Sequence, residues 1–140
     1  MVATVEPDMR PDSFFHVAVK VEDIDECVAF YRDHFDAELL ERGDAESGEG
    51  ATAVDHAALS VADKRVYFFD RAPYEAAGLV DDVPPGFLHF GFVVPDVECA
   101  HRDLAAAGVD FFMEPTVFGD LEVAFFTDPA GSRVELIEHR

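Results

Sequence analysis

Two stretches of the chain share one pattern of apolar and polar positions. "SFFHVAVKVEDID" begins at Ser13, and "GFLHFGFVVPDVE" begins at Gly86. In both, apolar residues alternate with a histidine and a small residue, which is typical of a strand with one buried face. Asp23 and Asp96 then precede apolar residues at helical spacing, and an acidic residue in that place is a helix N-cap signal. The pattern therefore predicts a strand followed by a helix, twice.

Three further strands are expected after each helix. The offset that aligns the two histidines also aligns Asp23 with Asp96, so the similarity extends beyond the first strand of each copy. The strands are expected at 14–21, 37–41, 56–61 and 65–69 in the first copy and at 88–94, 109–113, 121–127 and 133–138 in the second. The sequence thus predicts an α+β protein built from two βαβββ modules.

The module boundaries are expected where the periodic pattern is lost. Residues 1–12 contain two prolines and no periodicity, which predicts a mobile tail. Residues 13–140 are expected to form one domain, with module 1 at about 13–72, a connector at 73–86 and module 2 at about 87–140. The stretch "GDAESGEGAT" in module 1 is expected to be a flexible turn.

The amino-acid composition favours a folded protein and argues against nucleic-acid and membrane partners. The 140 residues are 49% hydrophobic and include 14 Phe, which predicts a folded globule rather than a disordered acidic chain. The formal net charge is −20, from 30 acidic and 10 basic side chains spread along the whole sequence. Such a charge repels nucleic acid and anionic membranes, so neither is an expected partner. We interpret the acidic surface as that of a halophilic protein.

The cysteines and the apolar runs indicate the compartment. Cys27 and Cys99 show no CxxC spacing and no signal peptide is recognisable, which favours reduced thiols and a cytoplasmic protein. No apolar run approaches the roughly 20 residues that a membrane-spanning helix needs.

The repeated histidines are the first candidates for chemistry. His16 and His89 alternate against the apolar stripe on which the helices are expected to pack, so they point away from the helices. Glu135 alternates in the same way on the last strand, and a buried carboxylate needs a proton donor or a metal beside it. Two imidazoles and one carboxylate are typical ligands of a divalent metal with positions left open for substrate. Ordinary core histidines, or a metal-free pocket of the same shape, are the alternatives.

These residues resemble a known family. The paired "FFHVAVKVEDID" and "FLHFGFVVPDVE" units and the closing "FFTDPAGSRVELIE" look like the vicinal oxygen chelate superfamily, which includes glyoxalase I, bleomycin-resistance proteins, methylmalonyl-CoA epimerase and extradiol dioxygenases. The resemblance covers residues 14–138. It implies that the two modules pair into an eight-stranded, cup-shaped mixed sheet with helices outside. It also implies a homodimer and a metal bound by His16, His89 and Glu135.

One position departs from the pattern of the family's lyases and epimerases. Those enzymes usually carry a fourth ligand, Glu, Gln or His, on the last strand of the first module. Aligning "RVYFF" with "RVELI" places Tyr67 there, and a one-residue slip would place Phe68 there. The remaining set of two histidines and one glutamate resembles that of the extradiol dioxygenases. It favours Fe(II), with Zn, Mn, Ni and Co as alternatives.

The resemblance implies a small-molecule substrate and three function classes. The first is a metal-dependent enzyme, like the extradiol dioxygenases, whose substrate chelates the ion through neighbouring oxygen atoms. The second is a glyoxalase-like lyase or isomerase, and the third is a drug-binding protein like those of bleomycin resistance. Tyr67 and His56 are candidate catalytic residues, and Phe69 and Phe125 are candidates for an aromatic wall beside the substrate. Core filling by the phenylalanines and a surface position for His56 are the alternatives.

Overall fold

The fold is α+β, with an eight-stranded mixed sheet and three helices in the part of the chain that is described. The computed structural model describes residues 10–44, 53–129 and 131–140. The elements are β1 (Ser13–Lys20), α1 (Ile24–Phe35), β2 (Glu38–Gly43), β3 (His56–Val61), β4 (Lys64–Phe69), α2 (Pro73–Ala76), β5 (Gly86–Val93), α3 (Val97–Ala106), β6 (Asp110–Phe118), β7 (Leu121–Thr127) and β8 (Arg133–His139). The strand order is β2-β3-β4-β1-β5-β8-β7-β6.

The chain divides into two compact units. One covers Phe15–Gly91, and the other, called here the C-terminal unit, joins the residues up to Phe14 with Phe92–Arg140. Strand β5 contributes to both units, because the division falls after Gly91.

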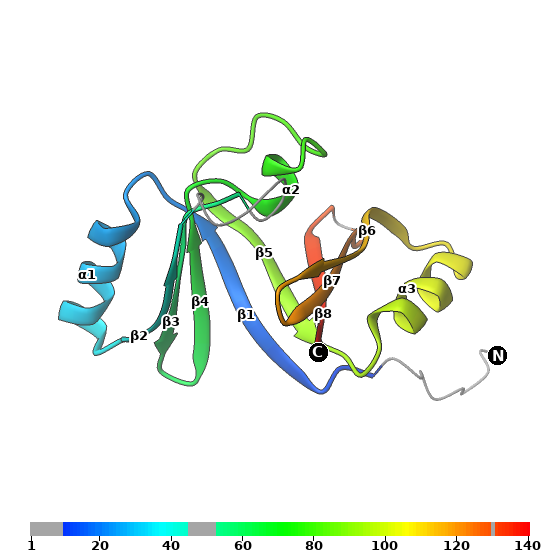
Figure 1. Ribbon diagram of the computed structural model, residues 1–140, viewed down its shortest axis with the longest axis horizontal. Helices are drawn as coiled ribbons and strands as arrows, with labels where there is room; N and C mark the ends of the chain where they lie inside the picture. Colours follow the sequence, from blue (N-terminus) through cyan, green and yellow to red (C-terminus); the bar gives the residue numbers. More distant parts are fainter. Residues whose placement is uncertain (1–9, 45–52, 130) are drawn as a thin grey trace. The chain divides into compact units, whose positions relative to one another are not determined.

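In the 15–91 unit, helix α1 covers one face of strands β2, β3 and β4 (Figure 1). Strand β1 pairs in parallel with β4, while β3 pairs antiparallel with both β2 and β4. The core under the helix contains Ile24, Val28, Ala37, Ala57, Leu59 and Phe68. Val19 of β1 packs against this core, so the alternate residues of β1 face away from α1.

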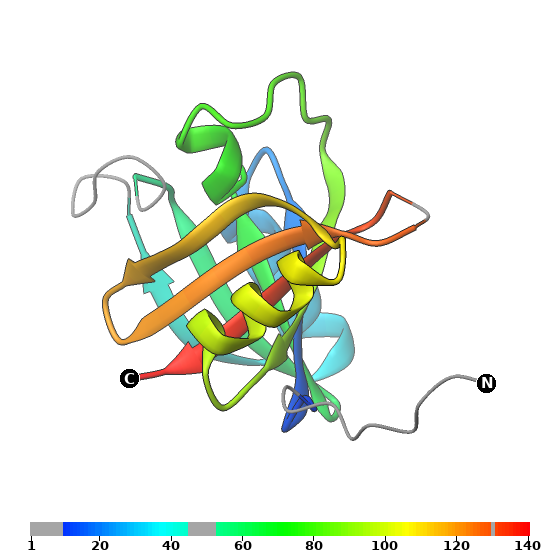
Figure 2. The ribbon, with the colours of Figure 1, turned by 90° about the vertical axis from the view of Figure 1, so that its right-hand side faces the viewer.

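In the C-terminal unit, helix α3 packs on β6, β7 and β8 (Figure 2). The three strands are antiparallel neighbours. The core under α3 is formed by Val94, Val97, Ala100, Ala124 and Leu136. The modules read from the sequence therefore each place one helix on an apolar sheet face, as the alternation predicts.

Both long helices begin at the predicted aspartates. The Asp23 carboxylate accepts a hydrogen bond from the Glu26 backbone N–H at 3.0 Å, and Asp96 accepts one from Cys99 N–H at 2.9 Å. These bonds satisfy amides that have no partner within the helix. The bond from the Cys99 amide lowers the pKa of the Asp96 carboxyl.

The structure corrects two element predictions. Strand β6 continues to Phe118 rather than ending near Met113, and the register shifts around Pro115. An edge strand tolerates proline because the lost N–H is not needed for a second neighbour. The connector contains a short helix, α2, that the sequence analysis did not predict. Most of the expected tail and the stretch 45–52 of the expected turn lie outside the described residues.

Among the described residues, no helix has the length and apolar character needed to cross a membrane.

Acidic residues crowd together near the start of α3, which leads to a first prediction. Burial, followed by the charges of Glu98 and Glu138, raises the pKa of the Glu122 carboxyl. Glu122 and Glu138 are register partners on β7 and β8. A carboxyl with a raised pKa destabilises the fold once it ionises, so the penalty is present above that pKa and absent well below the ordinary value.

Glu122→Gln should therefore raise the melting temperature at neutral pH by roughly 2 °C, the scale of a partly exposed charge interaction. The gain should disappear below the ordinary carboxyl pKa. Glu114→Gln, an exposed position on β6, is the matched control. Scanning calorimetry at several pH values checks this, and an equal gain at acid pH would contradict the electrostatic explanation.

The net charge of −20 gives a second prediction. Screening shortens the range of charge repulsion from about 10 Å at 0.1 M salt to about 3 Å at 1 M. The melting temperature of the wild-type protein should therefore rise continuously from dilute buffer to molar KCl. The Glu122→Gln gain should shrink over the same range. A melting temperature independent of KCl would end the halophilic interpretation.

Candidate metal centre

Two buried histidines lie side by side in the 15–91 unit. His16 comes from the middle of β1 and is 4% exposed, and His89 comes from the middle of β5 and is 1% exposed. Their ring centroids are 5.5 Å apart, with an interplanar angle of 81°. The structure thus brings together the two residues that the sequence repeat singled out.

The local pattern explains why the His16 ring lies on the sheet face away from α1. Val19 packs into the core below α1, so His16 and Ala18 belong to the opposite face of β1. Ala18 is fully buried, and its register partner on β4 is Tyr67. The small side chain leaves room on this face for the large aromatic ring.

Tyr67 lies beside the histidine pair. Its ring centroid is 4.7 Å from that of His16, and the two rings are tilted by 47°. Phe68 instead belongs to the core under α1 and is 2% exposed. The pairing of β4 with β1 therefore puts Tyr67 on the histidine face, and the one-residue slip that would put Phe68 there does not occur.

An aromatic row continues from Tyr67 along the same sheet face. Phe69 stacks on Tyr67 with centroids 6.1 Å apart, and the His56 ring lies 6.0 Å from Phe69. His56 Nε2 is 2.7 Å from a carboxylate oxygen of Glu41 on β2. His56 is therefore held by an acidic partner at the far end of the row from His16. Sequence reasoning did not identify Glu41, because its pairing with His56 depends on the register of β2 and β3.

The His56 ring also depends on a glycine. Gly43 is its register partner on β2, and a Cβ added at Gly43 would lie 2.2 Å from His56 Cε1. That separation is far below any van der Waals contact, so only glycine allows the ring its observed place.

Glu135 belongs to the C-terminal unit. It lies in β8 between Val134 and Leu136, and Leu136 packs under α3. Glu135 therefore belongs to the sheet face away from that helix, and it is 9% exposed. Its register partner on β7 is Phe125, which is 1% exposed and packs against Phe112 at 5.8 Å between ring centroids.

The second histidine has a partner that the sequence analysis missed. Tyr74 of helix α2 is fully buried, and its hydroxyl oxygen is 3.1 Å from His89 Nδ1. The Pro-Tyr-Glu sequence after Ala72 carries a helix-start signal, since proline is favoured at the first helical position. That signal could have located α2, but not the contact with His89.

The rings of His16 and His89 fit a shared metal ion. Metal–nitrogen bonds of about 2.1 Å place two neighbouring imidazole ligands with centroids roughly 5 to 6 Å apart. The observed separation of 5.5 Å lies within this range. Imidazole nitrogen is a good ligand for Fe, Zn, Ni and Cu, so the pair does not select one metal.

Comparisons with known proteins place the chain among related sequences. A family model described as the Glyoxalase/Bleomycin resistance protein/Dioxygenase superfamily matches residues 13–136. A lactoylglutathione lyase of Pseudomonas aeruginosa is 28% identical, and the match covers 93% of this chain and 88% of that protein. The lactoylglutathione lyase GLX1 of Arabidopsis thaliana is also 28% identical, but the match covers 89% of this chain and 44% of the plant protein. The chain thus spans less than half the length of that relative.

A solved structure shows the same fold. The methylmalonyl-CoA epimerase of Mycobacterium tuberculosis superposes with a TM-score of 0.75 at 22% identity, covering 100% of this chain and 93% of that one. At this identity the similarity concerns the fold alone.

Proposed function

Because the chain belongs to the Glyoxalase/Bleomycin resistance protein/Dioxygenase superfamily, we propose that it is a divalent-metal-dependent enzyme acting on a small molecule with neighbouring oxygen atoms. The observation that carries the proposal is the pair of buried imidazoles on one sheet face, with ring centroids 5.5 Å apart. Ordinary core histidines would not need to occupy the equivalent position in both copies of a repeat.

We propose that His16, His89 and Glu135 are the protein ligands. Two imidazoles and one carboxylate are a ligand set that can hold a divalent ion and leave coordination positions for substrate. The burial of Glu135, on the sheet face away from α3, supports this role, because a buried carboxylate is costly without a compensating charge. A bound ion would act as a Lewis acid toward the substrate oxygens.

The first candidate reaction is proton transfer, as in a lyase or an isomerase. It is favoured by the relatives, which are named as lactoylglutathione lyases. In this proposal the Tyr67 hydroxyl contacts the substrate beside His16, and Phe69 extends the aromatic wall. His56, held by Glu41, lies at the end of this row and orients the polar end of the substrate.

The second candidate is a ring-cleaving dioxygenase that uses Fe(II). The observation that favours it is the position of Tyr67. The structure puts a phenol, rather than a carboxylate, amide or imidazole, beside His16 on β4. Three protein ligands leave positions for both a catechol and O₂. The aromatic rings of Tyr67 and Phe69 would stack on a catechol, and Phe125 is a further candidate wall residue.

One set of assays separates these candidates. Metal-free protein is reconstituted with Fe(II), Zn, Mn, Ni or Co, and each form is tested with methylglyoxal plus a thiol and, separately, with a catechol under air. Metal-dependent turnover of the first mixture supports the lyase, and O₂ consumption with the catechol in the Fe(II) form alone supports the dioxygenase. Metal-independent ligand binding without turnover would contradict both candidate reactions and favour a drug-binding protein.

A homodimer and a cytoplasmic location stay predictions. Light scattering coupled to gel filtration tests the first, and a monomer of 15.4 kDa would contradict it.

A further inference from the structure

Tyr74 makes two polar contacts through one hydroxyl group. Its hydroxyl is 3.3 Å from the Leu88 carbonyl oxygen, to which it can donate, and 3.1 Å from His89 Nδ1. Tyr74 is fully buried and His89 is 1% exposed, so water does not compete at this contact. The phenol ring also packs against the imidazole, with centroids 5.5 Å apart and an interplanar angle of 60°.

One arrangement of the protons makes hydrogen bonds of both contacts. A carbonyl oxygen can only accept, so the single hydroxyl proton bonds Leu88 only when the hydroxyl oxygen is left to accept from His89. The contact with His89 is then a hydrogen bond only when His89 Nδ1 carries the proton. A neutral imidazole protonated at Nδ1 has its lone pair at Nε2.

We propose that Tyr74 is a positioning residue that holds His89 in the Nδ1–H tautomer, with Nε2 directed as the metal-binding atom. The ligand role of Nε2 rests on the proposed function, whereas the tautomer does not. Histidine ligands in proteins almost always donate their second nitrogen to a fixed acceptor, which sets the ring orientation and raises the basicity of the ligand. A tyrosine hydroxyl is an acceptor of this kind.

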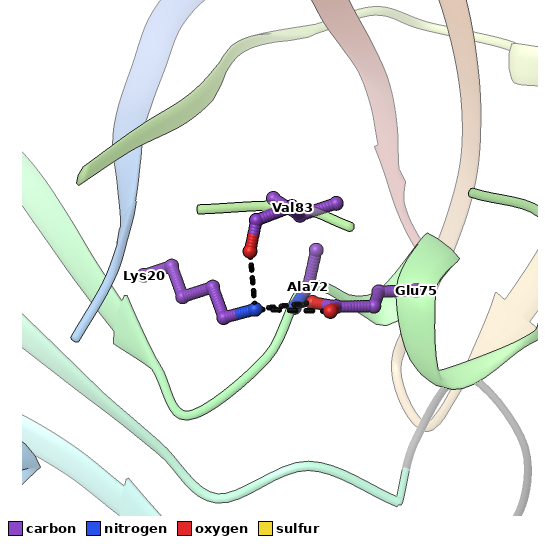
Figure 3. A network of polar contacts seen from close by, with 4 residues as sticks. All are labelled: Lys20, Ala72, Glu75 and Val83. Atoms are coloured by element: carbon purple, nitrogen blue, oxygen red, sulfur yellow. Dashed lines mark hydrogen bonds and ion pairs between the residues drawn. The ribbon is translucent and has the colours of Figure 1, made fainter. Parts of the chain in front are cut away.

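Helix α2 has only four residues, so it needs a tertiary anchor to hold Tyr74 in place. Figure 3 shows that anchor, centred on Lys20 at the end of β1. Its ammonium contacts both carboxylate oxygens of Glu75, at 3.0 and 2.9 Å, and the Val83 carbonyl at 2.6 Å. Glu75 also accepts from the Ala72 amide at 3.1 Å.

Through Lys20, the anchor connects β1 to two points of the connector, Glu75 near its start and Val83 near its end. Lys20 and Glu75 side chains are 16% and 20% exposed, so the ion pair is largely shielded from water. Lys20 is on the same strand face as His16, four residues further along β1. We infer that Lys20 fixes α2 relative to β1 and that Tyr74 transmits this placement to His89.

The tautomer can be read directly in metal-free protein. Long-range ¹H–¹⁵N correlation spectra distinguish a protonated ring nitrogen from an unprotonated one, and they should show His89 with a protonated Nδ1 and an unprotonated Nε2. Tyr74→Phe removes the acceptor and keeps the ring, so the His89 signals should shift toward a mixture of tautomers. A wild-type His89 protonated at Nε2 would overturn the proposal, whether or not the protein binds metal.

Metal affinity provides the second readout. Tyr74→Phe should weaken binding of Zn or Co(II) by about 10- to 100-fold in competition titrations. Tyr31→Phe, on helix α1, is the matched control and should leave the affinity unchanged. Equal affinities for wild type and Tyr74→Phe would overturn the positioning role, while absence of metal binding by the wild type would instead count against the proposed function.

Lys20 is tested with the only other lysine as its control. Lys20→Met should weaken metal binding in the same direction as Tyr74→Phe and shift the His89 ¹⁵N signals, because α2 loses its anchor. Lys64→Met removes an exposed pair with Asp63 and should change neither. His89 signals unchanged in Lys20→Met would remove Lys20 from the positioning chain.

Discussion

His89→Ala should strongly weaken metal binding and leave the fold intact. Structural Zn sites with four protein ligands bind with about 10 to 16 kcal/mol, so one ligand contributes about 2.5 to 4 kcal/mol. Its loss corresponds to a roughly 10²- to 10³-fold weaker Kd. The same result is expected for His16→Ala, because the two buried rings lie beside each other on one sheet face. Competition titration with a chromophoric chelator measures the change.

The control for these variants is His34→Ala. His34 is an exposed residue near the end of α1, where its ring packs on Phe30. The His34→Ala variant should bind metal with the same affinity as the wild type. If His34→Ala and His89→Ala weaken binding equally, the ion binds to the acidic surface and the two buried histidines are ordinary core residues.

Phe68→Ala should destabilise the 15–91 unit by about 3 to 5 kcal/mol, the usual cost of removing a buried aromatic ring. Phe68 is 2% exposed under α1 and packs on Tyr31 with ring centroids 5.6 Å apart. Its side chain is on the opposite face of β4 from Tyr67, so the substitution should lower the free energy of unfolding without changing the Tyr67 face. Urea unfolding followed by circular dichroism measures it.

Two variants calibrate this prediction. Phe87→Ala removes a ring that is 56% exposed and should change stability by less than about 0.5 kcal/mol. Tyr67→Phe should leave stability nearly unchanged and alter substrate turnover. A Phe68→Ala protein as stable as Phe87→Ala would mean that the β4 register differs from the one described here.

Local signals made most of the fold predictable. Asp23 and Asp96 identify both long helices because an N-cap acts on amides only three residues away. Strand β6 was predicted too short because Pro115 normally ends a strand, and its tolerance at the sheet edge depends on neighbours that the local sequence does not reveal.

The candidate site residues that the sequence predicted best are those that the internal repeat places at equivalent positions. His16 and His89 stand out because duplication places them at equivalent positions. The choice between Tyr67 and Phe68 needed the pairing of β4 with β1, which the structure provides. Tyr74 was not predictable, because its contact with His89 forms between a proline-rich connector and a strand that follows it, and no periodic pattern encodes such a contact.

The central claim is that His16, His89 and Glu135 bind one divalent ion, and X-ray absorption at the metal edge tests it most directly. Protein loaded with one equivalent of Co(II) should give a spectrum that fits two imidazole ligands together with oxygen ligands. His89→Ala should lose one imidazole contribution, and Glu135→Ala should keep both imidazoles while metal affinity falls. A wild-type spectrum with oxygen ligands alone, unchanged in His89→Ala, would contradict the account.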